Sequence, residues 1–389
     1  MGQRRKRIGM GLVGPGFIAP HHIDAVRRLG YIDVIAIAGS SQSSADRKAE
    51  QLDIDRAYGS YLDLINDPDI DVVHNTTPSY MHFPISMATI KAGKHIISDK
   101  PLAVTPDECA QLAAAAAAAG VVNAVTFNYR GNPLVQQARL MVAEQNIGAL
   151  NFVHGYYLQD WMTDANVYSW RSDPTKNGVS SALADIGSHW CDLAEHISGS
   201  TITAVLADLT TVVKTRYSAG GSAEAFSTNV SAERRPVAVN SEDLASVLVR
   251  FANGAKGCFS VGQVAPGHKN DLQIEFNGRA GSLRWIQERQ NELWIGRHDQ
   301  PNAVMLKDPA ALLPAARPYA HLPAGHQEAW SDAFRNVIGD IYTWIVTGEK
   351  GPTISTFADG YRISRVIQAM LKSNEAGGTW QPVEAQVNA

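Results

Sequence analysis

Residues Ile8 to His22 have the sequence Ile-Gly-Met-Gly-Leu-Val-Gly-Pro-Gly-Phe-Ile-Ala-Pro-His-His. We expect an apolar strand up to Val13, then Gly14, Gly16 and Ala19 in the spacing G-x-G-x-x-A, then a helix. Gly14 permits a tight turn, Gly16 lets a dinucleotide pyrophosphate approach the backbone, and Ala19 lets the helix pack closely on the strand. The amides at the start of such a helix favour phosphate groups. The stretch therefore predicts a dinucleotide-binding turn.

Short apolar runs alternate with helical patterns through the first third of the chain. Such runs suit parallel strands that are buried on both faces. We therefore predict an α/β Rossmann domain with a doubly wound parallel sheet over residues 1–130. Its strands are expected at Arg7–Val13, Asp33–Ala38, Val72–Asn75, His95–Ser98 and Asn123–Phe127.

Longer β-type segments dominate residues 131–375, for which we predict an α+β domain. Asn253-Gly254 and Asn277-Gly278 are strong turn signals between such segments. They indicate a large open, mostly antiparallel sheet with helices on one face. Residues 376–389 are expected to form a polar tail.

The composition excludes several classes of protein. The 389 residues are 45% hydrophobic with a net charge of −4, so there is no electrostatic case for nucleic-acid binding. No apolar run is long enough to span a membrane. Cys109, Cys191 and Cys258 lie far apart and form no C-x-x-C motif, so we expect reduced thiols in a cytoplasmic protein and no structural zinc.

The end of the second predicted strand bears on the choice between NAD and NADP. A carboxylate at this position commonly holds the ribose 2′-hydroxyl of NAD. Here Gly39 is followed by Ser40 and Ser41, with Arg47 and Lys48 nearby. This pattern favours NADP or the use of both cofactors, and a hydrogen bond from Ser40 to the ribose of NAD is an equal alternative.

Polar residues also follow the third and fourth predicted strands, whose carboxyl ends border the cofactor crevice in such a fold. Thr77 and Pro78 follow the third strand, His82 begins the next helix, and Asp99 and Lys100 follow the fourth strand. A lysine there can bind a substrate hydroxyl or the nicotinamide ribose and stabilise developing alkoxide charge. A surface lysine in a turn is an equal alternative.

The stretch Asp-Ile-Gly-Ser-His places Asp185 and His189 on one face if it is helical. The histidine could take a proton near neutral pH, and the carboxylate could orient it or bind a sugar hydroxyl. A packed, hydrogen-bonded histidine is the alternative. Cys191, Asp192 and His196 raise a metal site as a further alternative, but neighbouring helix positions give poor tetrahedral geometry.

Aromatic and polar residues precede this stretch, in Tyr156–Trp161 and in Tyr168–Arg171. They could line a sugar pocket, because aromatic faces stack on pyranose C–H groups while polar groups bind hydroxyls. Core packing explains the aromatic residues equally well. His326 could reach the pocket, although a residue at the start of a helix is the simpler interpretation.

These motifs together resemble the glucose–fructose oxidoreductase, inositol dehydrogenase and MocA (Gfo/Idh/MocA) family over nearly the whole chain. The resemblance rests on Gly11–Ala19 with His22, Thr77-Pro78 with His82, Asp99-Lys100-Pro101, and Asp185-x-x-x-His189. Asp99 stands where the family has Glu. The stretches around Gln159–Trp161 and Asp185–Trp190 resemble the branch that acts on sugars, glycosides, anhydrosugars and inositols.

The resemblance implies an NAD(P)-dependent dehydrogenase that moves a hydride between nicotinamide C4 and a secondary alcohol, giving a keto-sugar or inosose. Lys100 and His189 would flank the reacting carbinol. His189 would accept the hydroxyl proton, Lys100 would polarise the same oxygen, and Asp185 would fix a neighbouring hydroxyl or the histidine. The family commonly forms homodimers or homotetramers through the open sheet.

Two other functions compete with this interpretation. One is an NAD-dependent glycosidase on the same fold, which borrows the hydride and returns it. The other is a cofactor-binding regulator, against which the joint presence of Lys100, Asp185 and His189 argues. The predicted cofactor residues are Gly14, Gly16, Phe17, Ile18, Ser40, Ser41, Thr77, Pro78, His82, Asp99, Lys100 and Asn128. The predicted substrate residues are Lys100, Arg130, Gln159, Trp161, Trp170, Arg171, Asp185, His189 and His326.

Overall fold

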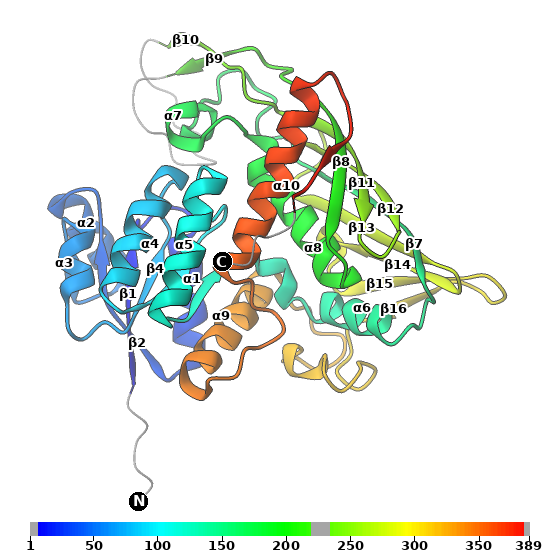
Figure 1. Cartoon of the computed structure of the whole chain (residues 1–389). Helices are drawn as coiled ribbons and strands as arrows, with labels where there is room; N and C mark the ends of the chain where they lie inside the picture. Colours follow the sequence, from blue (N-terminus) through cyan, green and yellow to red (C-terminus); the bar gives the residue numbers. More distant parts are fainter. Residues whose placement is uncertain (1–6, 219–233, 385–389) are drawn as a thin grey trace, which may run out of the picture. The chain divides into compact units, whose positions relative to one another are not determined.

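The computed structural model describes residues 7–218 and 234–384 (Figure 1). The chain forms two compact units. The first contains Met1–Asn128 and Phe334–Tyr361, and the second contains Tyr129–Ala333 and Arg362–Ala389.

The first unit is built on a six-stranded parallel sheet with the order β3-β2-β1-β4-β5-β6. The order reverses between β1 and β4, and in such sheets ligands bind at the carboxyl ends of the strands at that point. The predicted doubly wound sheet is therefore confirmed. The strands are β1 (Ile8–Val13), β2 (Ile32–Ala38), β3 (Arg56–Tyr58), β4 (Val72–Asn75), β5 (His95–Ser98) and β6 (Asn123–Val125).

The helices of this unit are α1 (Ala19–Leu29), α2 (Gln42–Leu52), α3 (Tyr61–Asn66), α4 (His82–Lys91), α5 (Pro106–Ala119) and most of α9 (Trp330–Thr347). The sequence analysis placed residues 334–361 with the second domain, but they cluster with the first unit. The physical reason is ring packing, because Phe334 lies 4.8 Å from His22 and Tyr342 lies 5.8 Å from His74, measured between ring centroids.

The second unit contains a nine-stranded sheet with the order β16-β15-β14-β13-β7-β12-β11-β8-β17. All neighbouring strands are antiparallel except β7 and β12. This confirms the predicted open, mostly antiparallel sheet. The strands are β7 (Leu150–Leu158), β8 (Ile202–Thr210), β11 (Leu244–Phe251), β12 (Lys256–Gly262), β13 (Asp271–Gly278), β14 (Gly281–Ile286), β15 (Glu292–Arg297), β16 (Ala303–Leu306) and β17 (Gln381–Pro382).

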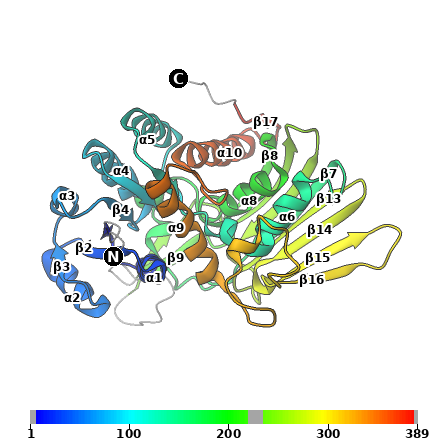
Figure 2. The same cartoon turned by 90° about the horizontal axis from the view of Figure 1, so that it is seen from below.

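Helices α6 (Pro133–Ala143) and α8 (Ser188–Ser198) cover one face of this sheet (Figure 2). The stacking of Trp190 on Phe259, with ring centroids 4.2 Å apart, holds α8 on the strands. Within the predicted tail, Gln381 and Pro382 form an edge strand on β8. No helix in the described ranges is long and apolar enough to cross a membrane.

The remaining elements of the described residues are short, apart from helix α10. They are β9 (Thr215–Ser218), β10 (Arg235–Ala238), α7 (Pro174–Asn177), α10 (Phe357–Glu375), the π-helical turn η4 (Leu183–Gly187), and the 3-10 turns η1 (Ser79–Met81), η2 (Asn128–Gly131), η3 (Trp170–Ser172), η5 (Gln287–Arg289) and η6 (Arg317–Tyr319).

Candidate active site

The turn after β1 has the geometry that a dinucleotide requires. Gly14 has φ 86°, and a Cβ on it would lie 2.6 Å from the side chain of Thr77. A Cβ on Gly16 would meet nothing closer than 4.0 Å, so the backbone there is open. Helix α1 then begins at Ala19, and its N-cap residue Ile18 makes no side-chain hydrogen bond to the helix. The open backbone and the uncapped helix start fit a pyrophosphate, with the exposed Phe17 beside them.

The end of β2 separates the roles of the two serines. Ser41 is the N-cap of α2, and its side chain accepts a hydrogen bond of 3.3 Å from the Ser44 amide. Ser40 is exposed. Ser41 is exposed as well, but its side chain already caps α2, so Ser40 is the better candidate of the pair for a ribose contact, which stays a prediction.

His82 bridges the ends of β4 and β5. Its Nε2 lies 2.8 Å from the Thr77 carbonyl oxygen and its Nδ1 lies 2.6 Å from the Pro101 carbonyl oxygen. The side chain is buried, and burial lowers its pKa. His82 therefore ties the segment of Thr77 and Pro78 to the segment of Lys100, and its direct contact with a cofactor stays a prediction.

Asp99, the residue before Lys100, is held by groups at the ends of β4 and β6. The Thr126 hydroxyl donates a 2.7 Å hydrogen bond to Asp99 Oδ1, and the Asp99 amide donates to the Asn75 carbonyl at 2.9 Å. These contacts hold the short Asp99 side chain, while Lys100 is partly exposed. Asn128 is buried, and its Nδ2 has no hydrogen-bond partner among the described residues.

In the second unit, Asp185 lies in the π-helical turn η4, which continues into α8. The sequence predicts a regular helix here, whereas π turns are rare and occur frequently at functional sites. Asp185 Oδ2 accepts a 2.8 Å hydrogen bond from Gln263 Nε2, and Oδ1 lies 3.4 Å from Arg171 Nε. The carboxylate is therefore held from two sides.

A network of amides and phenols surrounds this carboxylate. Gln159 Oε1 accepts a 2.9 Å bond from Trp161 Nε1, and Gln159 Nε2 donates to Asn270 Oδ1 at 3.1 Å. The Tyr157 hydroxyl donates to the same Asn270 oxygen at 2.6 Å and lies 2.7 Å from the Tyr129 hydroxyl. Burial raises the pKa of both tyrosines, so they are neutral at physiological pH.

The aromatic residues of the network also contact His189 and Arg171. The His189 ring is buried, with its centroid 5.0 Å from that of Tyr129. The Arg171 guanidinium carbon lies 4.4 Å from the Trp170 ring centroid and 6.0 Å from that of Trp161. The structure thus brings Gln159, Trp161, Trp170, Arg171 and Asp185 together.

Sequence reasoning missed three members of this network. Gln263 follows β12, Asn270 precedes β13, and Tyr129 lies within η2. None belongs to a recognisable motif, because their proximity depends on strand pairing between distant segments. The only available signal was weak: each of these polar residues lies at or near the end of a strand.

Two predicted substrate residues of the second unit lie outside the network. Arg130 is buried and binds Asp192 through two bonds of 2.8 and 2.5 Å. His326 is exposed, with Nδ1 3.3 Å from the Ala324 carbonyl oxygen. Their contact with substrate stays a prediction. Across residues 7–218 and 234–384, no group of three or more His, Cys, Asp or Glu residues could hold a metal ion.

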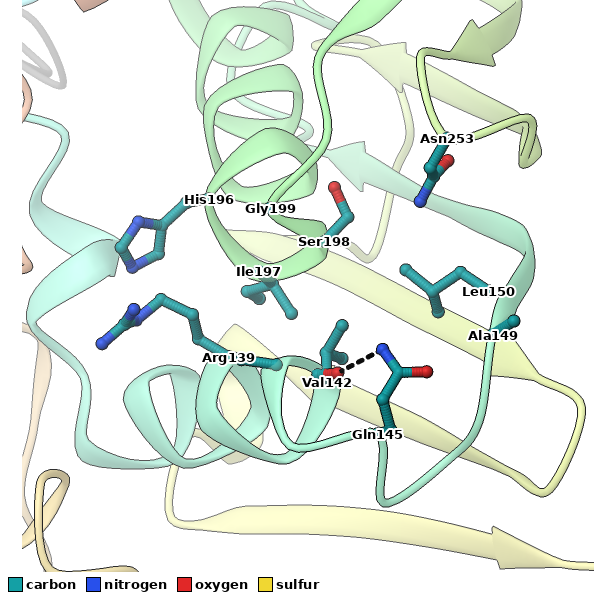
Figure 3. Close-up of a pocket in the computed structure, with 11 residues that line it drawn as sticks. Arg139, Val142, Gln145, Ala149, Leu150, His196, Ile197, Ser198, Gly199 and Asn253 are labelled. Atoms are coloured by element: carbon teal, nitrogen blue, oxygen red, sulfur yellow. Dashed lines mark hydrogen bonds between the residues drawn. The ribbon is translucent and has the colours of Figure 1, made fainter.

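A pocket of about 420 Å³ also opens in the second unit, but none of its lining residues belongs to the network (Figure 3). Arg139 and His196 lie at one end and Asn253 at the other. Burial and the two neighbouring arginines lower the pKa of His196 well below its ordinary value. The lining residues are Arg139, Val142, Ala143, Gln145, Ala149, Leu150, His196, Ile197, Ser198, Gly199 and Asn253.

Two family models match the chain, one in each part of the sequence. Residues 8–127 match the model of an oxidoreductase family with an NAD-binding Rossmann fold, and residues 135–284 match the GFO/IDH/MocA C-terminal domain. Levoglucosan dehydrogenase of Pseudarthrobacter phenanthrenivorans is 31% identical over 385 residues, covering 95% of this chain and 96% of that protein.

Solved structures are similar along the whole chain. Levoglucosan dehydrogenase in complex with NADH and levoglucosan has a TM-score of 0.86 at 29% identity, covering 97% of this chain and 99% of that one. An inositol dehydrogenase homologue from Azotobacter vinelandii, in complex with NAD+, has a TM-score of 0.84 at 25% identity, covering 98% of each chain. The chain belongs to the Gfo/Idh/MocA oxidoreductase family, with an NAD-binding Rossmann fold in its N-terminal part.

Proposed function

We propose that this chain is an NAD-dependent dehydrogenase of a secondary alcohol on a sugar-like ring: a pyranose, glycoside, anhydrosugar or inositol. The observation that carries the proposal is the network around Asp185. It presents a carboxylate, amides, an arginine and indole rings in one place, and this combination binds a polyhydroxylated ring. Levoglucosan dehydrogenase, at 31% identity, supports an anhydrosugar as the first candidate.

The proposed roles of the residues follow from their chemistry. The nicotinamide, when bound, supplies the hydride acceptor. His189 accepts the hydroxyl proton at one of its ring nitrogens, because a neutral imidazole is the side chain best suited to take a proton near pH 7. Lys100 donates a hydrogen bond to the same oxygen and stabilises its developing charge. Asp185, held by Gln263 and Arg171, accepts a hydrogen bond from a neighbouring hydroxyl.

Gly14 and Gly16 would hold the pyrophosphate, and Ser40 would donate to the ribose. We propose NAD as the preferred cofactor, which the family description and the relative solved with NADH support. Because this position has a serine and no carboxylate, the 2′-phosphate of NADP is not repelled, and NADP is not excluded. We expect NADP to bind, but more weakly than NAD.

The test is a substrate panel read by the near-ultraviolet absorbance of reduced nicotinamide. Levoglucosan, glucose, simple glucosides, myo-inositol and scyllo-inositol are each supplied with NAD and, separately, with NADP. Stoichiometric reduction of cofactor with one of these sugars supports the proposal. Sugar cleavage without net reduction would instead identify the NAD-dependent glycosidase.

We also propose a homodimer or homotetramer assembled through the face of the nine-stranded sheet opposite α6 and α8. Leu248 on β11 is 46% exposed, and Val304 and Leu306 on β16 are 53% and 63% exposed. Exposed apolar side chains on strands favour association. Light scattering should give an oligomer mass that Leu248→Asp lowers, and a monomeric wild-type chain would contradict the proposal. A cytoplasmic location stays a prediction.

A further inference from the structure

Two consecutive acids, Glu242 and Asp243, are buried directly before β11. Both residues are only 4% exposed. Burial of a carboxylate is costly unless hydrogen bonds compensate it. The position of these two residues therefore depends on their partners, and the partners belong to two different segments around Asp185.

Glu242 binds the segment that leads into the π-helical turn. Its Oε1 accepts hydrogen bonds from the Ser180 hydroxyl at 2.8 Å, the Ser181 amide at 2.8 Å and the Leu183 amide at 2.9 Å. Its backbone oxygen accepts from the Ala182 amide at 3.1 Å. Four consecutive residues, 180–183, are thus fixed to Glu242, and only Ala184 separates them from Asp185.

Asp243 binds a different segment through an arginine. Its two carboxylate oxygens accept hydrogen bonds from the Val212 and Val213 amides at 2.7 and 3.0 Å, and Oδ2 also lies 3.5 Å from the fully buried Arg216 guanidinium. Arg216 Nη1 in turn donates to the carbonyl oxygens of Asp164 and Val167, at 3.3 and 3.2 Å. These carbonyls belong to the loop between Trp161 and Trp170. Removal of the Asp243 carboxylate would take away the larger of the two negative charges, Asp243 and Asp164, that stabilise the buried Arg216 guanidinium.

We propose that Glu242 and Asp243 are positioning residues of the reaction: Glu242 sets the placement of Asp185 and His189, and Asp243, through Arg216, sets the loop that carries Trp161, Trp170 and Arg171. The inference rests on the proposed function, because it assigns these two acids to the same site. The two arms differ in kinetics, since Glu242 acts on the reacting groups and Asp243 acts on the residues that hold the sugar.

Glu242 is tested by Glu242→Ala and Glu242→Gln. The alanine variant should lower kcat roughly tenfold to a hundredfold, because small displacements of reacting groups are costly. Glutamine keeps Oε1, the atom that accepts all three side-chain bonds, so Glu242→Gln should recover kcat to within a few-fold of wild type. The affinity for NADH, measured by fluorescence, should be the same in all three proteins.

Glu195→Ala is the matched control. Glu195 lies on α8, binds the Ile202 amide at 2.7 Å and pairs with Arg362 at 3.0 Å, so its loss also removes a held carboxylate. It should lower stability without changing kcat. An equal loss of kcat in Glu195→Ala and Glu242→Ala, or an unchanged kcat in Glu242→Ala, would overturn the Glu242 assignment. If Glu242→Ala does not fold, Ser180→Ala removes one of the bonds and should lower kcat in the same direction.

Asp243→Ala should raise the KM for the sugar roughly tenfold with a smaller change in kcat. Asp243→Asn should reverse part of this increase in KM. A fall in kcat alone would overturn this arm.

Hydrogen–deuterium exchange separates these results from a failure of the proposed function. Even if wild-type protein oxidises no sugar, amides of residues 181–187 should exchange faster in Glu242→Ala and not in Glu195→Ala, and unchanged exchange would overturn the proposal.

Discussion

At the scale of single residues, the candidate site contains some side chains that belong to short sequence motifs and others that belong to no motif. The placement of Lys100 after a strand, and of Asp185 and His189 around the start of a helix, could be predicted because strand ends and helix spacing are local features; their roles stay predictions. Gln263 could not be predicted, because its 2.8 Å bond to Asp185 joins segments that are distant in sequence. The neighbours of Asp185 are thus set by strand pairing.

Lys100→Ala and His189→Ala should each lower kcat roughly a hundredfold or more, because each removes a group that acts on the reacting oxygen. Steady-state kinetics with the sugar found in the panel measures this effect. NADH affinity should change little, and variants with nearly normal turnover would exclude these two residues from the mechanism.

Ser40→Asp should reduce kcat/KM with NADP by roughly tenfold or more and preserve kcat/KM with NAD, because the new carboxylate repels a 2′-phosphate and accepts the 2′-hydroxyl. Parallel assays with the two cofactors measure the ratio. Ser41→Ala, which removes the α2 cap, serves as a control and should change stability rather than the ratio. An equal loss with both cofactors in Ser40→Asp would place Ser40 outside the ribose site.

At the scale of elements, hydrophobic pattern and turn signals predicted the two sheets well. The start of α5 was also predictable, because Thr105 and Glu108 form a capping box within one helical turn. The π-helical turn at Leu183–Gly187 could not be predicted, because Glu242, which is distant in sequence, binds the amides of Ser181 and Leu183. Tertiary contacts override local helix preference at this position.

The turn between β1 and α1 allows stability and cofactor binding to be separated. Gly14→Ala should destabilise the protein by about 1 kcal/mol or more, because φ is positive and Thr77 is too close for a Cβ. Gly16→Ala should leave the free energy of unfolding nearly unchanged, because no atom lies within contact of its Cβ. It should weaken NADH binding, since the added methyl enters the space of the pyrophosphate. Denaturant titration and NADH fluorescence measure both quantities, and unchanged NADH affinity in Gly16→Ala would contradict the assignment of the turn.

At the scale of the whole molecule, one feature of the first unit makes stability depend on pH. His22 Nδ1 lies 2.9 Å from His74 Nδ1, and His74 Nε2 lies 2.9 Å from the Tyr342 hydroxyl, all in the buried core. Burial lowers the pKa of His22 to about 4 and also lowers that of His74. Both rings are therefore neutral in the folded protein at neutral pH.

Stability should fall as the pH decreases from about 6.5 towards 4, because the unfolded chain then binds protons that the folded chain does not. For His22 alone the full loss is about 3 kcal/mol, reached near its folded pKa of about 4. Thermal or denaturant unfolding at several pH values measures it. His326→Gln, which changes an exposed histidine, should keep the same pH dependence, and a pH-independent free energy of unfolding over this range would contradict the neutral histidine pair.

The most direct measurement of the central claim is the transfer of deuterium from sugar to cofactor. Levoglucosan, or whichever sugar proves active in the panel, is supplied with deuterium on its ring carbons together with unlabelled NAD, and the reduced cofactor is analysed by mass spectrometry and NMR. Direct hydride transfer from the sugar should give one deuterium on nicotinamide C4 for each keto-sugar formed. Reduced cofactor without deuterium, or deuterium returned to a cleaved sugar with no net reduced cofactor, would contradict it.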